Sequence, residues 1–103
     1  MTRQVMVRYR VKPEQVAENE QLVAKVYEQL AREAPPGLRY LTFKLADGVT
    51  FVHIATIEVV EGRNPLVELA AFKAFSAGVQ QRCDELPVTT EWSEVGSYAF
   101  FGR

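Results

Sequence analysis

The chain of 103 residues has little of what disulfide, metal or membrane chemistry requires. A single cysteine, Cys83, excludes a disulfide framework and any cysteine-based metal site within one chain. A single histidine, His53, with no His-x-x-x-His or Glu-x-x-His spacing, gives no recognisable set of metal ligands. No apolar run approaches the roughly 18 residues of a membrane span, and the first residues lack the apolar region of a signal peptide. These absences predict a soluble, cytoplasmic protein without a metal.

The chain also lacks an excess of charge of either sign. Twelve basic and thirteen acidic residues leave a formal net charge of -1, so the totals do not favour nucleic acid or an anionic membrane as a partner. No glycine-rich phosphate loop and no nucleophile elbow are present. With 48% hydrophobic residues and no linker, residues 1–103 are expected to form one domain.

The hydrophobic pattern changes period along the chain. From Gln4 to Lys12, apolar and polar side chains alternate with period two, which predicts a strand. From about Pro13 to Ala34 the apolar residues fall within one arc of a helix, and Pro35-Pro36-Gly37 ends it.

The remaining elements are read from turn residues and periodicity. Ala46-Asp47-Gly48 predicts a tight turn in which Gly48 takes positive φ. Asn64-Pro65 predicts the start of a helix, with a kink or break near Ala71 to Ala74 because the apolar phase changes there. The pattern predicts strands over residues 38–45 and 49–59. Leu86-Pro87 is expected to end the second helical region, followed by irregular chain over 88–93 and a final short strand over 95–101.

The order β-α-β-β-α-β predicts an α+β, ferredoxin-like fold, with a four-stranded antiparallel sheet and both helices on one face. The third strand is apolar on both faces, and Leu41, Phe43 and Leu45 add an apolar row to the second. Because helices cover only one face, we expect a homodimer in which two sheets pack into a shared, barrel-like core.

Four short stretches together cover about residues 4 to 80: RVKPE (10–14), PGLRY (36–40), TFVHIATIE (50–58) and AFKAF (71–75). In sequence and order they resemble the antibiotic biosynthesis monooxygenase family of the dimeric α+β barrel superfamily. The resemblance implies this fold, a homodimer, and an activity that uses no cofactor.

The chain departs from the family's pattern at positions that matter for chemistry. Ile57 stands where many relatives have tryptophan, and Ala71 stands where many have histidine. Haem-degrading relatives also carry an asparagine on the first strand, and residues 2–12 contain none. We therefore do not expect haem degradation.

Candidate catalytic residues are His53 and Tyr9. The ordinary pKa of histidine suits a base at neutral pH, although an imidazole on an apolar strand face is more often structural. Glu20 falls inside the apolar arc of the first helix, where a carboxylate either loses solvent or reaches outward. Candidate substrate-binding residues are Tyr40, Glu20, Phe72, Phe75 and Trp92.

Two functions remain open at this point. One is a cofactor-independent monooxygenase or related oxidoreductase acting on a small aromatic or quinol-like substrate, as the resemblance implies. The other is a non-catalytic dimeric protein that binds an apolar small molecule or a partner. Nucleic-acid binding through the sheet is disfavoured by the near-zero charge.

Overall fold

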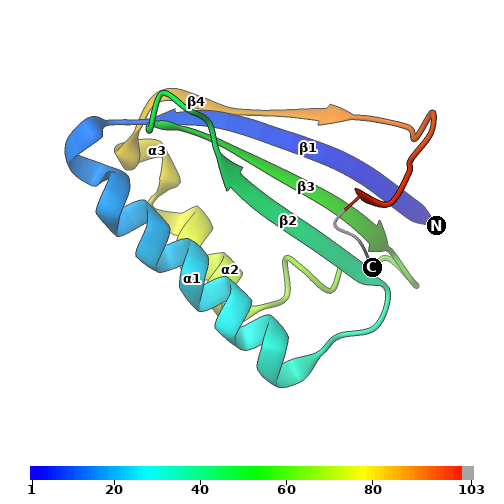
Figure 1. Ribbon diagram of the computed structural model, residues 1–103. Coiled ribbons are helices and arrows are strands. Elements are labelled where there is room, and N and C mark those ends of the chain that lie inside the picture. Colours follow the sequence, from blue (N-terminus) through cyan, green and yellow to red (C-terminus); the bar gives the residue numbers. More distant parts are fainter. Residues whose placement is uncertain (101–103) are drawn as a thin grey trace.

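A four-stranded antiparallel sheet, with strand order β2-β3-β1-β4, forms one layer of the molecule, and helices cover one of its faces (Figure 1). This computed structural model describes residues 1–100. The elements in chain order are β1 (Thr2–Val11), η1 (Pro13–Gln15), α1 (Val16–Glu33), β2 (Leu38–Lys44), β3 (Thr50–Glu58), α2 (Ala70–Ala77), α3 (Val79–Arg82) and β4 (Cys83–Glu91). The predicted ferredoxin-like arrangement, with both helical regions on one face, is confirmed.

The two central strands, β1 and β3, pair along almost their whole length. Val7 lies opposite His53 and Tyr9 lies opposite Phe51. Since successive side chains of a strand point to opposite faces, these residues all face the helices. The alternation predicted for β1 is confirmed: Tyr9 and Val11 are buried, whereas Arg8 and Arg10 are exposed.

Helix α1 forms where the apolar arc was predicted, after a short 3-10 turn at Pro13. Val26 is buried in the arc, and Leu22, Val23 and Leu30 pack against the core from it. The helix ends as Ala34 adopts a left-handed conformation with φ 42°, and the amide of Ala34 donates to the carbonyl of Leu30.

The second helical region differs from the prediction. Helix α2 begins at Ala70, six residues after Asn64, and is continuous across the predicted kink at 71–74. Asn64 instead caps a turn, since its Oδ1 accepts from the amides of Leu66 and Val67 at 2.9 and 3.3 Å. The break lies at Gly78, which separates α2 from α3. The change of apolar phase therefore marks a turn followed by a helix.

The prediction of the last strand was wrong. Leu86-Pro87 was read as a terminator and 88–93 as irregular, but β4 runs through both, and residues 92–100 contain no strand. Residue 101, the last of the predicted strand, lies outside the described residues. Proline is tolerated because β4 is an edge strand, and its pairing with β1 shifts register between Arg8 and Arg10, where Pro87 lies.

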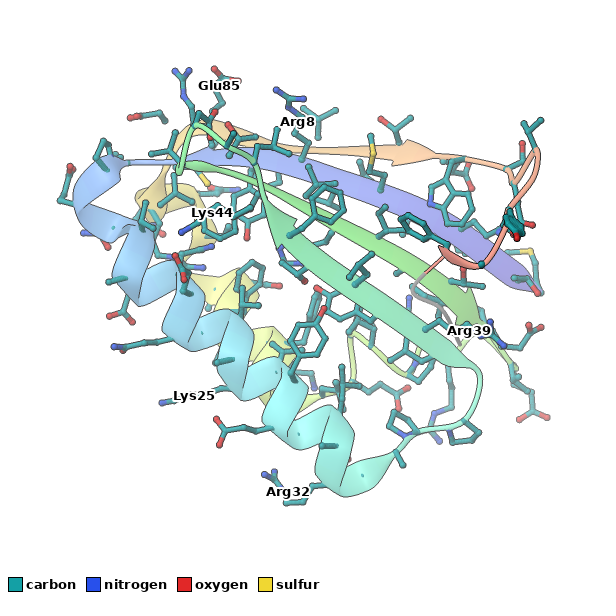
Figure 2. All side chains as sticks on the ribbon, in the orientation of Figure 1. Arg8, Lys25, Arg32, Arg39, Lys44 and Glu85 are labelled. Carbon is teal, nitrogen blue, oxygen red and sulfur yellow. The ribbon has the colours of Figure 1, made fainter. Side chains whose placement is uncertain are left out.

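The other face of the sheet carries no helix. Phe43 on β2 is 39% exposed and Val88 on β4 is 64% exposed. Their neighbours on this face include Met6, Leu41, Val52 and Ile54. Arg8 and Glu85 also point to this side, away from the helices (Figure 2). No helix within residues 1–100 is long and apolar enough to cross a membrane.

Candidate functional site

A cavity of about 160 Å³ lies between the sheet and helices α2 and α3. Its walls are almost entirely apolar, with Val5 and Val7 from β1, Ala55 from β3, and Phe72 and Phe75 from α2. Tyr9, Tyr40 and His53 also line it, and their polar atoms, which hydrogen-bond to one another, form very little of its surface. Ser76 lines the cavity and is exposed, so the mouth lies beside α2.

His53 lies between two tyrosine hydroxyls. Its Nε2 is 2.7 Å from Tyr9 Oη, and its Nδ1 is 2.5 Å from Tyr40 Oη and 3.2 Å from Thr42 Oγ1. The Phe75 ring packs beside the imidazole, with 5.4 Å between ring centroids. Both nitrogens therefore have partners, and the ring is only 5% exposed.

A second set of polar groups lies behind Tyr9, on the side of α1 and α3. Asn19 Nδ2 donates to Tyr9 Oη at 3.0 Å, and Arg82 Nε donates to Asn19 Oδ1 at 3.0 Å. Arg82 Nη2 also donates to the carbonyl oxygen of Phe75 at 2.9 Å. Asn19 is 0% exposed and Arg82 is 5% exposed, so a full charge is buried next to the cavity wall.

Burial controls the ionisation of these groups. Loss of solvent lowers the pKa of His53 from its ordinary value of 6.5 to about 4, so the imidazole is neutral at pH 7. The same loss of solvent raises the pKa of both Tyr9 and Tyr40 well above that of a free tyrosine. The site therefore holds a neutral imidazole and two neutral hydroxyls in the wall of an apolar cavity.

No family model and no curated protein matches the sequence. Solved structures do. The protein named "Putative antibiotic biosynthesis monooxygenase from Nitrosomonas europaea" superposes with a TM-score of 0.74 at 19% identity, covering 91% of this chain and 90% of that one. A mutant of SnoaB, a cofactor-independent oxygenase from Streptomyces nogalater, gives 0.67 at 16% identity, covering 93% and 95%. A protein from Caulobacter crescentus with the same name as the first gives a TM-score of 0.67 at 19% identity, covering 92% and 91%.

This chain has the antibiotic biosynthesis monooxygenase fold. The likeness extends over nine-tenths of the chain and of each of these neighbours. It therefore confirms the fold that the four sequence stretches implied.

Within the antibiotic biosynthesis monooxygenase fold, the cavity brings together five of the seven predicted site residues. They are Tyr9, Tyr40, His53, Phe72 and Phe75. Their common position follows from β1, β2 and β3 being neighbours in the sheet, with α2 packed across them.

Glu20 and Trp92 lie elsewhere. Glu20 is exposed, and its carboxylate pairs with Lys44 Nζ at 2.9 Å, so it reaches outward from α1. Trp92 follows the end of β4, where its amide donates to the carbonyl of Gln4. The aromatic residues near it, Tyr98 and Phe100, are exposed rather than part of a cavity wall.

Three residues of the polar network were not identified from the sequence: Asn19, Thr42 and Arg82. Asn19 had a signal, because it lies three residues after Val16 and four before Val23, inside the apolar arc of α1. Arg82 had none, since a lone arginine near Gly78 gives no sign of burial in the sequence. Within residues 1–100, no three His, Cys, Asp or Glu side chains are grouped so that they could hold a metal ion.

Proposed function

We propose that this protein is a cofactor-independent monooxygenase that oxidises a small, electron-rich aromatic compound of the phenol or hydroquinone class. One observation carries the proposal: a neutral imidazole, held by two tyrosine hydroxyls, faces an apolar cavity. SnoaB, which is a cofactor-independent oxygenase and shares this fold, supports the same activity.

The reaction needs only the substrate and O₂. His53 accepts the phenolic proton, with Tyr9 as the adjacent hydroxyl, and the phenolate ring becomes electron-rich enough to reduce O₂. A C–O bond forms at a ring carbon that carried hydrogen, giving a hydroperoxide. Proton return and loss of water leave a carbonyl there. A hydroquinone, C₆H₆O₂, plus O₂ then gives a hydroxyquinone, C₆H₄O₃, plus H₂O, and the substrate supplies all four electrons.

The cavity also favours a substrate with a single ring. Its volume, about 160 Å³, is close to the roughly 150 Å³ of an apolar protein cavity that stays dry and takes up benzene. Phe72 and Phe75 provide flat apolar walls, and the tyrosine and histidine groups provide the polar contacts that orient a hydroxyl. The protein's contribution is orientation, proton transfer and exclusion of water.

A specific observation supports a second function, which is binding without turnover. Both nitrogens of His53 already have hydrogen-bond partners, as expected for a purely structural imidazole. Under this alternative the same cavity holds an apolar ring that is never oxidised.

We also propose that the helix-free sheet face packs against a second copy of the chain. Apolar side chains occupy the middle of that face, among them Met6, Leu41, Val52 and Ile54. Phe43 adds apolar area to this face, and the exposed Arg8 lies beside these residues. Packing two such sheets face to face would remove a large apolar surface from water.

Oxygen consumption tests the enzymatic proposal. Protein treated with a chelator is mixed with single-ring hydroquinones, and O₂ uptake is measured against the spontaneous rate. We expect uptake that His53→Phe, which keeps a ring but has no nitrogen, lowers by about 10²-fold or more, the usual contribution of a general base.

A matched pair of variants tests whether the cavity is the site. Ser76→Phe adds a ring at the mouth, whereas Ala77→Phe adds the same ring on the next, exposed residue, which does not line the cavity. Only the first should abolish uptake. If single-ring ligands raise the melting temperature but no quinol is consumed above background, the binding function replaces the enzymatic one.

A further inference from the structure

The direction of the hydrogen bonds behind His53 can be worked out from Arg82. A guanidinium has five N–H donors and no acceptor, so every hydrogen bond of Arg82 is donated. Its Nε and Nη2 are both engaged, with Asn19 Oδ1 and the carbonyl of Phe75, and its Cζ lies 5.2 Å from the centroid of the Phe75 ring. Arg82 takes part in none of the ion pairs formed within residues 1–100.

The position of Arg82 fixes the amide of Asn19. Because Oδ1 must accept from Arg82 Nε, the NH₂ group of Asn19 is turned to Tyr9, and Nδ2 donates to Tyr9 Oη at 3.0 Å. The reversed amide would place two donors against each other at Arg82. Asn19 is fully buried in the first turn of α1, so no solvent relieves such a conflict.

Tyr9 therefore accepts from one side and donates to the other. If its hydroxyl hydrogen did not point to His53 Nε2, 2.7 Å away, it would point into the apolar cavity without an acceptor. Nε2 is then the bare nitrogen, and Nδ1 carries the hydrogen of the neutral ring. This hydrogen is donated to Tyr40 Oη at 2.5 Å.

The rest of the network accommodates the same direction. Thr42 Oγ1 lies 3.2 Å from His53 Nδ1, so it can also accept from that nitrogen, and it lies 2.8 Å from the hydroxyl of Tyr27. Tyr40 is only half-buried, so its own hydroxyl hydrogen depends less on a protein acceptor than that of Tyr9, which is 2% exposed. With the hydrogen on Nε2 instead, Tyr9 Oη would receive two donors and its own hydrogen would be left over.

We propose that Arg82 and Asn19 are positioning residues that hold His53 in the Nδ1–H tautomer, leaving Nε2 as a proton acceptor that reaches the cavity through Tyr9. The catalytic consequence rests on the proposed function: a substrate hydroxyl donates to Tyr9 Oη while the proton of Tyr9 moves to Nε2. The assignment of the tautomer itself needs no substrate.

Nitrogen-15 NMR of the protein without an affinity tag tests the proposal. His53 is the only histidine, so the long-range ¹H–¹⁵N spectrum contains one imidazole, and it shows directly which nitrogen carries hydrogen. At about pH 7 we expect hydrogen on Nδ1 and a bare Nε2. Hydrogen on Nε2 in the unmodified protein would overturn the inference.

Asn19→Asp should reverse the direction of the hydrogen bonds between residue 19, Tyr9 and His53, although the two side chains have almost the same shape. One carboxylate oxygen still accepts from Arg82, but the other replaces Nδ2 and is acceptor-only, so Tyr9 must donate to it. His53 Nε2–H then donates to Tyr9, and the spectrum should show the opposite tautomer. The control, Asn64→Asp, adds the same charge where the side-chain oxygen only accepts from backbone amides.

The expected results separate this inference from the proposed function. A change of tautomer in Asn19→Asp and none in Asn64→Asp supports the positioning role, even if no quinol is ever consumed. An unchanged tautomer in Asn19→Asp overturns it, even if the protein is an active oxygenase. Where turnover exists, kcat should fall by about 10²-fold in Asn19→Asp with little change in KM, because the base is lost and the cavity walls are not.

Discussion

Acid should destabilise this protein through one buried imidazole. In the folded chain the pKa of His53 is about 4, compared with 6.5 when the ring is in water. The folded state therefore resists protonation, and the unfolded state binds more protons at every pH between these values. The neutral His53 therefore costs no unfolding free energy above about pH 6.5. The unfolding free energy falls as the pH drops below that value, and His53 causes no further loss below about pH 4.

The magnitude follows from the two pKa values. Their difference of about 2.5, at 1.36 kcal/mol for each pH unit, corresponds to a full loss of about 3 kcal/mol, of which about 2 kcal/mol is lost between roughly pH 7 and pH 5. Urea denaturation at both pH values measures the loss, and His53→Phe supplies the background from all other groups. An NMR titration of His53 gives its pKa directly.

The reasoning would be refuted if the unmodified protein and His53→Phe lost the same unfolding free energy between these two pH values. A titration midpoint of His53 near 6.5 would refute it as well. Either result would mean that water reaches the imidazole. The cavity would then not be the dry site from which the proposed chemistry was derived.

Two further predictions concern the backbone and the assembly. Gly37 has φ +76°, and a Cβ there would lie 2.8 Å from Glu58 Cβ, whereas Gly62 has φ +74° with nothing within 4 Å. Gly62→Ala should lower the unfolding free energy by about 1 kcal/mol, from backbone strain alone. Gly37→Ala should lower it by about 1–3 kcal/mol more, because of the clash with Glu58. Equal losses for the two variants in urea denaturation would contradict the clash. Light scattering should give twice the chain mass of 11.6 kDa, and Val88→Asp on the open sheet face should shift it toward 11.6 kDa; a single-chain mass for the unmodified protein would rule out the sheet-to-sheet dimer.

Much of the fold could be predicted because its signals are local. The alternation around Tyr9, the single arc of α1 and the Asp47-Gly48 turn each act over a few residues, and the structure has each in place. The last strand was misplaced because Pro87 ends a central strand but not an edge strand. Whether a strand lies at an edge depends on the completed sheet, which a local pattern does not contain.

The candidate site was predictable to the extent that it lies on the strands. Tyr9, Tyr40 and His53 occupy strand faces whose direction follows from period two, so their meeting in one cavity could be expected once the sheet order was known. Glu20 was chosen over Asn19 because a charge inside an apolar arc is easier to notice than an amide. One residue of offset along α1 separates a side chain in solvent from one that is fully buried. The burial of Arg82 could not be predicted, because its hydrogen bond to Asn19 joins residues far apart in the sequence.

Oxygen-isotope labelling tests the central claim most directly. The protein, freed of metal by a chelator, is supplied with a single-ring hydroquinone under ¹⁸O₂, and the product is analysed by mass spectrometry. The proposed mechanism predicts one ¹⁸O atom in the quinone product and the other in water, at a rate that depends on His53. Unlabelled product accompanied by hydrogen peroxide, or labelling equally fast with His53→Phe, would contradict it.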